Sequence, residues 1–347
     1  MDKVSKILLV LAALVVGGIL AARLMFPSNA ISIIGTSGNA GQEQGVGIPV
    51  DDDSNGGISV NHPVTEEELN VLVATYDFDT EFYPYFRTLS DEQKKAYYFI
   101  YDCVIKGEEE VFFGKTVRVD KNEIMDVVNA VYLDNPGLFW METGARYSYN
   151  RKNGMTSSVI PEYNDYINDL DNNRNEFESQ VQAIVREAKA YESQGIVYME
   201  ALVHDHLCER CVYDLDAHNH QSAFSCLVEG SSVCGGYARA FQYVMQQLGV
   251  PAYYVMGQAI VSEGGPHAWV IVMIGGNAYN VDVTWDDDLG RQMGESVHAF
   301  FNVTDAQIAR THQRDEVSEC LPRCTMEDLS YDKVIGDTIT ADEISWQ

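Results

Sequence analysis

The chain has 347 residues, of which 46% are hydrophobic and 11% aromatic, and this composition excludes a chain that is disordered throughout. The 52 acidic residues outnumber the 23 basic ones, so the net charge is −29 and nucleic-acid binding through phosphate contacts is excluded. The length is sufficient for a core domain and one additional module.

The N-terminal residues predict the cellular compartment. Lys3 and Lys6 precede an apolar run, and the 20 residues from Ile7 to Phe26 are enough for one membrane span. Lysines ahead of a span favour a cytoplasmic N-terminus and an extracytoplasmic body. We therefore expect a single-pass anchor in the cell membrane, with secretion after cleavage of a signal peptide as the alternative.

Residues 27–63 are dominated by Gly, Ser, Asn and Gln and show no apolar periodicity. Because this composition cannot bury much apolar surface, we expect a mobile linker that holds the folded body away from the membrane. Two folded parts are expected beyond it. The first is a mixed α/β module over residues 64–160, and the second is a larger domain over residues 161–347 with its core at 195–305.

The module over residues 64–160 contains two helix-start signals. Capping boxes at Thr65–Glu68 and Ser90–Gln93 each lead into an apolar helical spacing, so we expect a helix after each. The further elements expected here are a strand over 110–119, a helix capped by Asp120, and strands over 138–141 and 145–149. The pattern assigns no function to this module.

The larger domain begins with helical patterns. Apolar residues spaced through 162–192 predict one long amphipathic helix, and residues 193–207 predict a second helix. A polar loop follows and contains His218 and His220, which we interpret as exposed or capping histidines rather than metal ligands. The run Asp286–Asp288 is interpreted as solvated acids in a turn, so no calcium is assigned there.

A cysteine is expected on the first turn of a helix in the stretch Gly230–Phe241. Ser231 and Ser232 are suitable N-cap residues, and the apolar spacing after them predicts a buried helical face. Cys234 then lies where unpaired backbone N–H groups and the positive helix end favour a thiolate. The alternative from this stretch alone is a buried structural cysteine, which is the more common fate of a free thiol.

A β-hairpin is expected shortly after this helix. Two strand patterns, Pro266–Ile274 and Ala278–Trp285, flank the two-residue turn signal Gly275–Gly276. This loop places Asp282 opposite Trp269. His267 then lies opposite Thr284, on the same face as Asp282 and roughly 7–8 Å from it at Cα, which is within side-chain reach.

Cys234, His267 and Asp282 provide the parts of a nucleophilic catalytic set: a thiol, an imidazole and a carboxylate that orients the imidazole. The two glycines after the cysteine have no side chain, so a substrate backbone can approach the sulfur closely. The candidate substrate-binding residues are Gly235, Gly236, Tyr237, Trp269 and Trp285.

Three motifs in this region, Val233–Phe241, Gly265–Trp269 and Tyr279–Asp287, resemble the core motifs of the transglutaminase-like superfamily. The similarity is closest to the bacterial, extracytoplasmic members and covers about residues 195–305. It implies an α+β fold with a papain-like core, in which the helix that carries the cysteine packs on an antiparallel sheet. A smaller mixed α/β module and an N-terminal membrane segment would precede this core.

The resemblance also implies roles for the catalytic set: Cys234 is the nucleophile, His267 the general base and acid, and Asp282 the residue that orients His267. One departure is visible, because many relatives have Asn after the His-Ala-Trp motif and this chain has Val270. That change leaves the three residues of the catalytic set intact.

The chemistry implied is thiol-dependent acyl transfer on a peptide or glutamine carboxamide outside the cell. An amine acceptor gives cross-linking and water gives peptidase or amidase activity, and the sequence leaves both open. Expected partners are a protein or peptide substrate, with cell-wall peptide as one option, and the membrane through the N-terminal segment. The alternative is a catalytically silent binding or scaffold domain at the cell surface.

Six cysteines remain besides Cys234, and outside the cell their pairing in disulfides would be natural. The two close pairs are Cys208 with Cys211 and Cys320 with Cys324. For these four we expect disulfides first, free thiols second, and third a zinc site in which His204 or His206 compete as ligands. No metal or cofactor is assigned from the sequence.

Overall fold

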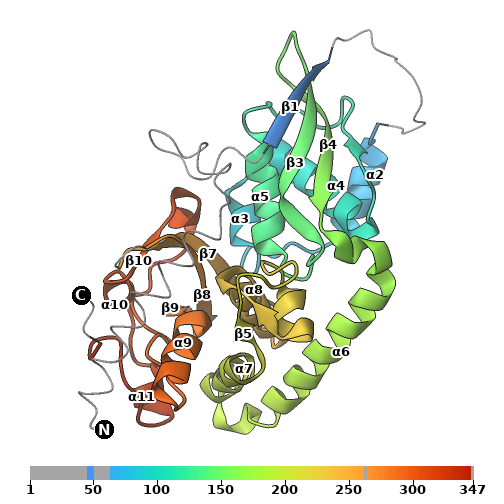
Figure 1. Ribbon diagram of the computed structural model, residues 1–347. Coiled ribbons are helices and arrows are strands. Elements are labelled where there is room, and N and C mark those ends of the chain that lie inside the picture. The colour runs from blue at the N-terminus through green and yellow to red at the C-terminus, as the bar shows by residue number, and fades with distance from the viewer. Residues whose placement is uncertain (1–44, 51–62, 262–263, 345–347) are drawn as a thin grey trace. The chain divides into compact units, whose positions relative to one another are not determined.

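The computed structural model describes residues 45–50, 63–261 and 264–344 (Figure 1). The predicted membrane segment over 1–26 and most of the predicted linker over 27–63 lie outside these ranges. Among the helices in the described part of the chain, none is long and apolar enough to cross a membrane. The described residues divide into two compact units, and the division falls between Asn173 and Arg174.

The first unit contains a four-stranded sheet in the order β1-β3-β4-β2, together with its helices. Its strands are β1 (Gly45–Val50), β2 (Val111–Phe112), β3 (Met141–Asn150) and β4 (Thr156–Tyr163). Its helices are α2 (Glu66–Thr75), α3 (Pro84–Thr88), α4 (Asp91–Lys106), α5 (Ile124–Asp134) and the short 3₁₀ turn η2 (Asp165–Asp169). In Figure 1 these elements run from blue to green, and β3 and β4 form the long antiparallel pair.

The two predicted capping boxes of this unit are confirmed. The side chains of Thr65 and Ser90 each accept the backbone N–H of the third helical residue, whose own side chain accepts the backbone N–H of the capping residue. Two other predictions are wrong. The strand expected over 110–119 is reduced to the two residues of β2, and α5 begins at Ile124 without a side-chain cap. Asp120 instead accepts the backbone N–H of Asn122, so its carboxylate closes a local turn.

The predicted linker contains a strand at the edge of the sheet. Residues 45–50 form β1, which pairs in parallel with β3 from Gly45 opposite Ala145 to Val50 opposite Asn150. The side chains of Val46 and Ile48 stay 61% and 43% exposed. Composition could not reveal this strand, since it is held by backbone pairing and not by burial of apolar side chains.

The second unit is built on a sheet in the order β10-β7-β8-β9, in which all neighbours are antiparallel. Its strands are β7 (Ala252–Ala259), β8 (Pro266–Ile274), β9 (Asn277–Val281) and β10 (His312–Arg314), with the separate short pair β5 (Val212–Tyr213) and β6 (Ser231–Ser232). Its longer helices are α6 (Leu170–Lys189), which begins before the division, α7 (Ile196–Arg210), α8 (Cys234–Gln247) and α9 (Val283–Met293). Its short helical elements are η3 (Glu192–Gln194), η4 (Ser225–Glu229), η5 (Glu316–Cys320), α10 (Asp305–Ile308) and α11 (Tyr331–Val334).

The core of the second unit lies where α8 packs on β7 and β8, while α7 packs against α8 and α9. The apolar face of α8 is fully buried, as its three/four spacing predicts, with Phe241 and Met245 at 0% exposure. The mixed α+β architecture is therefore confirmed, with the cysteine helix lying on an antiparallel sheet.

The hairpin register predicted from Gly275–Gly276 is confirmed, since Ile274 pairs with Asn277 and Val270 with Val281. The return strand is shorter than predicted and ends at Val281. Asp282 leaves the strand and becomes the N-cap of α9, where its Oδ1 accepts the backbone N–H of Trp285 at 3.1 Å. Thr284 therefore lies in a helix, and the partner of His267 is Gly257 on β7.

Candidate active site

Cys234 is the first residue of α8, and 4% of its surface is exposed. The prediction that Ser231 or Ser232 caps this helix is wrong: both lie in β6, and the N-cap is Val233, which makes no side-chain capping bond. The first backbone N–H groups of a helix have no intrahelical partner. A thiolate or an oxyanion at this helix start is therefore stabilised by the positive helix end, whose N–H groups donate to no capping side chain in its place.

Two polar side chains lie close to this cysteine. A Cβ atom built on Gly235 would collide with Gln221 Oε1, so the oxygen of that carboxamide lies directly against the first turn of α8. Burial raises the pKa of Tyr213 well above its usual range, and the charge of Cys234 is the next contribution. Both side chains are therefore candidates for contact with a group bound at the nucleophile.

His267 and Asp282 are brought together by the hairpin. His267 Nε2 lies 2.6 Å from Asp282 Oδ2, and the exposed fractions of the two side chains are 7% and 1%. Burial lowers the pKa of His267, but the charge and hydrogen bond of Asp282, followed by a hydrogen bond with Cys234, outweigh it and raise the pKa to about 10. Because Nε2 is engaged by Asp282, Nδ1 is the ring nitrogen left for Cys234.

Sequence reasoning missed a second histidine at this carboxylate. His312 Nε2 lies 2.9 Å from Asp282 Oδ2, the same oxygen that binds His267, and His312 Nδ1 lies 2.6 Å from Thr311 Oγ1. His312 starts β10, which pairs with β7 through His312 opposite Ala259. No local motif marks it, because a three-residue strand has no periodicity and its sequence position lies far from the other site residues.

The two imidazoles hold Asp282 as an anion. Burial would raise the pKa of Asp282, but the charge of His267 and hydrogen bonds from His267 and His312 outweigh it and place the pKa well below its usual range. Burial lowers the pKa of His312, and the charge of His267 adds to this. At neutral pH, His267 is therefore the charged imidazole and His312 the neutral one.

The five candidate substrate-binding residues separate into two groups. Tyr237 and Trp269 are at most 1% exposed, and they donate hydrogen bonds to Asp287 and Asn280 inside the core, so their contact with substrate stays a prediction. Gly236 is also a packing position, since a Cβ there would collide with Ser232 Oγ and the backbone oxygens of Ser222 and His220. The remaining two lie at the site: Gly235 beside the Gln221 amide, and half-buried Trp285 with its ring 5.8 Å from that of His267.

All seven cysteines are free thiols, so the disulfides expected first are not formed. The members of each close pair have different neighbours. Cys208 lies beside His204, whereas Cys211 lies beside Cys226. Cys324 is buried next to Arg314, whereas Cys320 is exposed.

The acidic run after Asp282 also differs from the prediction. Asp286 and Asp287 are buried on α9, not solvated in a turn, because each has a partner inside the core. Asp286 accepts the backbone N–H of Phe300, and Asp287 binds Arg291. His218 is exposed, as predicted.

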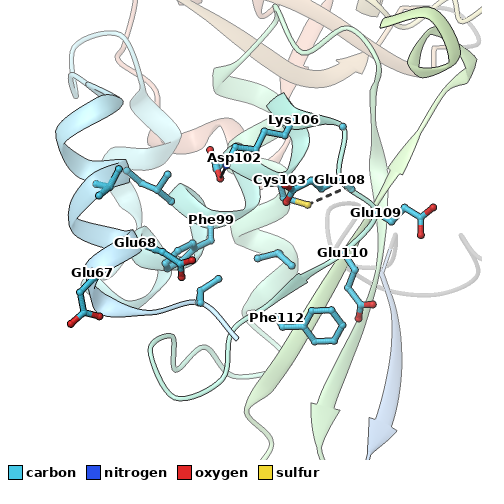
Figure 2. A pocket seen from close by; sticks show the side chains of 15 residues that line it. Glu67, Glu68, Phe99, Asp102, Cys103, Lys106, Glu108, Glu109, Glu110 and Phe112 are labelled. Atoms are coloured by element: carbon cyan, nitrogen blue, oxygen red, sulfur yellow. Dashed lines mark hydrogen bonds and ion pairs between the residues drawn. The ribbon is translucent and has the colours of Figure 1, made fainter. Parts of the chain in front are cut away.

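The first unit contains a pocket of about 840 Å³, lined by acidic and apolar side chains (Figure 2). Its cysteine, Cys103, is no candidate nucleophile, since burial raises the pKa of that thiol to about 12. Asp102 is engaged by Tyr76 and Lys106. Among the described thiols, Cys234 is the one that lies at a helix start and contributes to the raised pKa of a histidine. The chemistry is therefore assigned to the second unit.

Residues 181–285 match the family model of the transglutaminase-like superfamily, and this range contains Cys234, His267 and Asp282. These residues form a transglutaminase-like superfamily domain. The resemblance carried by the three motifs is thereby confirmed. The family supports a thiol enzyme that works by acyl transfer or hydrolysis.

Two solved structures are similar to the chain. One is the crystal structure of a candidate cysteine protease from Cytophaga hutchinsonii, with 24% identity, a TM-score of 0.27, and coverage of 30% of this chain and 37% of that one. The other is the crystal structure of a TGase, with 17% identity, a TM-score of 0.28, and coverage of 50% of each chain. The chain thus spans half or less of these two proteins. No match was found among curated proteins.

Proposed function

We propose that the transglutaminase-like domain catalyses thiol-dependent acyl transfer on a peptide or glutamine carboxamide, with Cys234 as the nucleophile. The observation that carries the proposal is the arrangement around His267. One side of its ring binds the buried carboxylate of Asp282 at 2.6 Å, and Cys234 is close enough to contribute, after Asp282, to the raised pKa of the imidazole. A thiol, a base and a residue that orients the base are the parts this chemistry requires.

The reaction proceeds in two steps. Before attack the proton of Cys234 resides on His267, so the sulfur attacks the carbonyl carbon as a thiolate and a carbon–sulfur bond forms. The carbon–nitrogen bond then breaks, and the leaving amine takes the proton back from His267. Water or a second amine next attacks the thioester, loses its proton to His267, and releases the acyl product with the Cys234 thiolate and the charged His267 restored.

The oxyanion of the tetrahedral intermediate needs hydrogen-bond donors that are already in place. The uncapped N–H of Cys234 at the start of α8 supplies one donor. We propose the Nε2–H of Gln221 as the second, because the carboxamide lies against Gly235 on the first turn of the same helix; its Oε1 is nearest to that glycine, so the amide turns to present Nε2 to the oxyanion. One such donor typically contributes about 3 kcal/mol to the transition state.

The acceptor decides between cross-linking and hydrolysis. The thiol and the imidazole are both enclosed, with exposed fractions of 4% and 7%. Enclosure of this kind limits the access of water to a thioester and supports an amine acceptor. We therefore propose that the domain transfers acyl groups to amines, with peptidase or amidase activity when no amine is present.

The test incubates the full chain with a glutamine-containing peptide and a primary amine, and the products are measured by mass spectrometry. We expect the amine to be joined to the glutamine with loss of ammonia, or the amide to be hydrolysed. Cys234→Ala should abolish both products, while Cys320→Ala, which removes an exposed thiol, should change neither. If Cys234→Ala forms the products at the wild-type rate, the proposal fails. If neither product forms with any peptide and amine tried, a binding or scaffold domain is favoured.

We further propose that the body lies outside the cell, anchored by the segment that ends at Phe26. The exposed thiol of Cys320 gives a direct test. A membrane-impermeant maleimide should label this thiol on intact cells that express the full chain. Labelling that appears only after lysis would place the body inside, and Cys320→Ala supplies the background.

A further inference from the structure

A second cluster of titratable side chains lies on α7 and in the segment that follows α9. His204 Nδ1 lies 3.3 Å from Asp205 Oδ1 and 3.8 Å from Cys208 Sγ. Asp205 Oδ1 lies 2.6 Å from His298 Nε2, and the nitrogen and oxygen atoms of the two histidines and the aspartate are all within 4.8 Å of one another. The ligand atoms of His204, Asp205 and His298 therefore converge on one point, and Cys208 Sγ lies next to one of them, His204 Nδ1.

Both ring nitrogens of His204 face acidic side chains. His204 is fully buried, and its second ring nitrogen, Nε2, lies 3.2 Å from Asp286 Oδ2. Both nitrogens of His204 thus face carboxylate oxygens, which are acceptors only when ionised. A neutral imidazole has one N–H, so one of the two contacts would set a lone pair against a lone pair. A second proton on His204, a proton on one of the two carboxyl groups, or a metal ion bound to Nδ1 would each remove this conflict.

We propose that His204 Nδ1, Asp205, Cys208 and His298 Nε2 form a tetrahedral site for a zinc-like divalent cation. The donor set suits zinc, which is bound by imidazole, thiolate and carboxylate, and not calcium or magnesium, which prefer oxygen ligands alone. With zinc bonds of about 2.0–2.3 Å, neighbouring ligand atoms of a tetrahedral site lie about 3.3–3.6 Å apart. The separations of 3.3 Å and 3.8 Å from His204 Nδ1 to Asp205 and Cys208 approach these values. Cys208 Sγ lies outside the 4.8 Å cluster of the other three atoms, so its side chain turns toward them as the metal binds, and the hydrogen bond between His298 and Asp205 opens as the metal replaces its proton.

Protons and charge balance in this exchange. The cation displaces one proton from the imidazolium of His204 and one from the thiol of Cys208, and both leave to solvent. The remaining proton of His298 moves to Nδ1. Two positive charges therefore enter as two protons leave, so the net charge of this buried region stays the same.

The surroundings match those of a protein metal site. Ligating histidines usually donate their other N–H to a carboxylate. Asp286 is placed to accept the Nε2–H of His204, and the carboxylate of Asp286 is fixed by accepting the backbone N–H of Phe300. The His298 ring stacks on Tyr331 at 3.6 Å, which fixes its orientation. The side chain of Asp205 is 37% exposed and provides the entry path for the ion.

The site would connect the two elements that support the active site. Its ligands tie α7 to the segment that follows α9, and Asp286 lies one helical turn after Asp282 on α9. Zinc is therefore proposed here as a structural ion that holds the α7–α9 packing, separate from the acyl-transfer chemistry of Cys234.

The experiment measures zinc binding by the full chain, stripped with a chelator and titrated with Zn²⁺ against a chromogenic indicator. We expect one Zn²⁺ per chain. Asp205→Asn and Cys208→Ser should each weaken the affinity at least ~10-fold. His206→Ala, on the same helix but outside the cluster, should leave it unchanged. Circular dichroism confirms that each variant is folded.

A second readout needs no comparison of variant stabilities. Co²⁺ bound to the wild-type chain should give the charge-transfer absorption of a thiolate ligand, and Cys208→Ser should lose that absorption while keeping the bands of tetrahedral Co²⁺. The inference is overturned if the wild type binds no Zn²⁺, or if Asp205→Asn binds it as tightly. It is also overturned if His312→Gln, in the separate His267–Asp282–His312 cluster, abolishes the binding.

Discussion

Asp282 performs two tasks that two substitutions can separate. Its Oδ1 caps α9 by accepting the N–H of Trp285, and its Oδ2 accepts hydrogen bonds from His267 and His312. Asp282→Asn keeps an oxygen for the cap, since Asn is as good an N-cap as Asp, but removes the charge. Asp282→Ala removes both, and loss of the cap should make it about 1 kcal/mol less stable than Asp282→Asn.

The charge effect has a sign and a pH window. The pKa of His267 is raised from the ordinary 6.5 to about 10, and Asp282 is the main cause that raises it. A raised folded-state pKa stabilises the protein fully below pH 6.5, and this contribution is lost as the pH rises through 10. At about 1.4 kcal/mol per pKa unit, the contribution is on the order of 3–5 kcal/mol.

The assay is urea unfolding of wild type, Asp282→Asn and Asp282→Ala at intervals between pH 6 and pH 10. We expect the stability advantage of wild type over Asp282→Asn to be largest near pH 6 and to shrink steadily toward pH 10, because only wild type loses the His267 contribution. Other titrating groups are shared by the three proteins and cancel in the difference. An advantage that stays constant across this range would refute the reasoning about His267.

Three further predictions concern single side chains near the nucleophile. His312→Gln should lower kcat about 10-fold with little change in KM, because Asp282 keeps its bond to His267 but loses a partner that fixes its position; an unchanged kcat would contradict this role. Gln221→Ala should lower kcat about 10²–10³-fold, because its amide N–H serves the oxyanion. Gln221→Glu, which keeps the bulk but has no amide N–H, should lose as much, and wild-type kcat in either variant would contradict the role. Gly236→Ala should lower the free energy of unfolding by about 1–3 kcal/mol in urea titrations, since its Cβ has no room against the preceding loop, and wild-type stability would refute the packing role.

Local signals predicted the elements that depend on local chemistry. The two capping boxes, the α8 helix and the hairpin register follow from residues a few positions apart, and the structure confirms each of them. The pairing of His267 with Asp282 could be predicted for the same reason, because a two-residue loop sets which residues share a face. These features needed no knowledge of the rest of the chain.

Features set by distant contacts could not be predicted in this way. His312 reaches Asp282 only because β10 pairs with β7, and β1 is fixed by backbone pairing with β3. Burial changed other interpretations: Asp286 is an internal partner of His204, and Trp269 belongs to the core. The cap on α9 was also missed, because Asp282 fits the end of a strand and the start of a helix equally well from its sequence neighbours.

The central claim is that His267 activates the thiol of Cys234. The most direct measurement is the rate of alkylation of Cys234 by iodoacetamide at pH 7, in a Cys320→Ala background that removes the exposed thiol, with and without His267→Gln. Peptide mass spectrometry separates Cys234 from the other thiols. The account predicts that His267→Gln slows alkylation of Cys234 at least ~10-fold while the chain stays folded. Equal rates in the two proteins would contradict it.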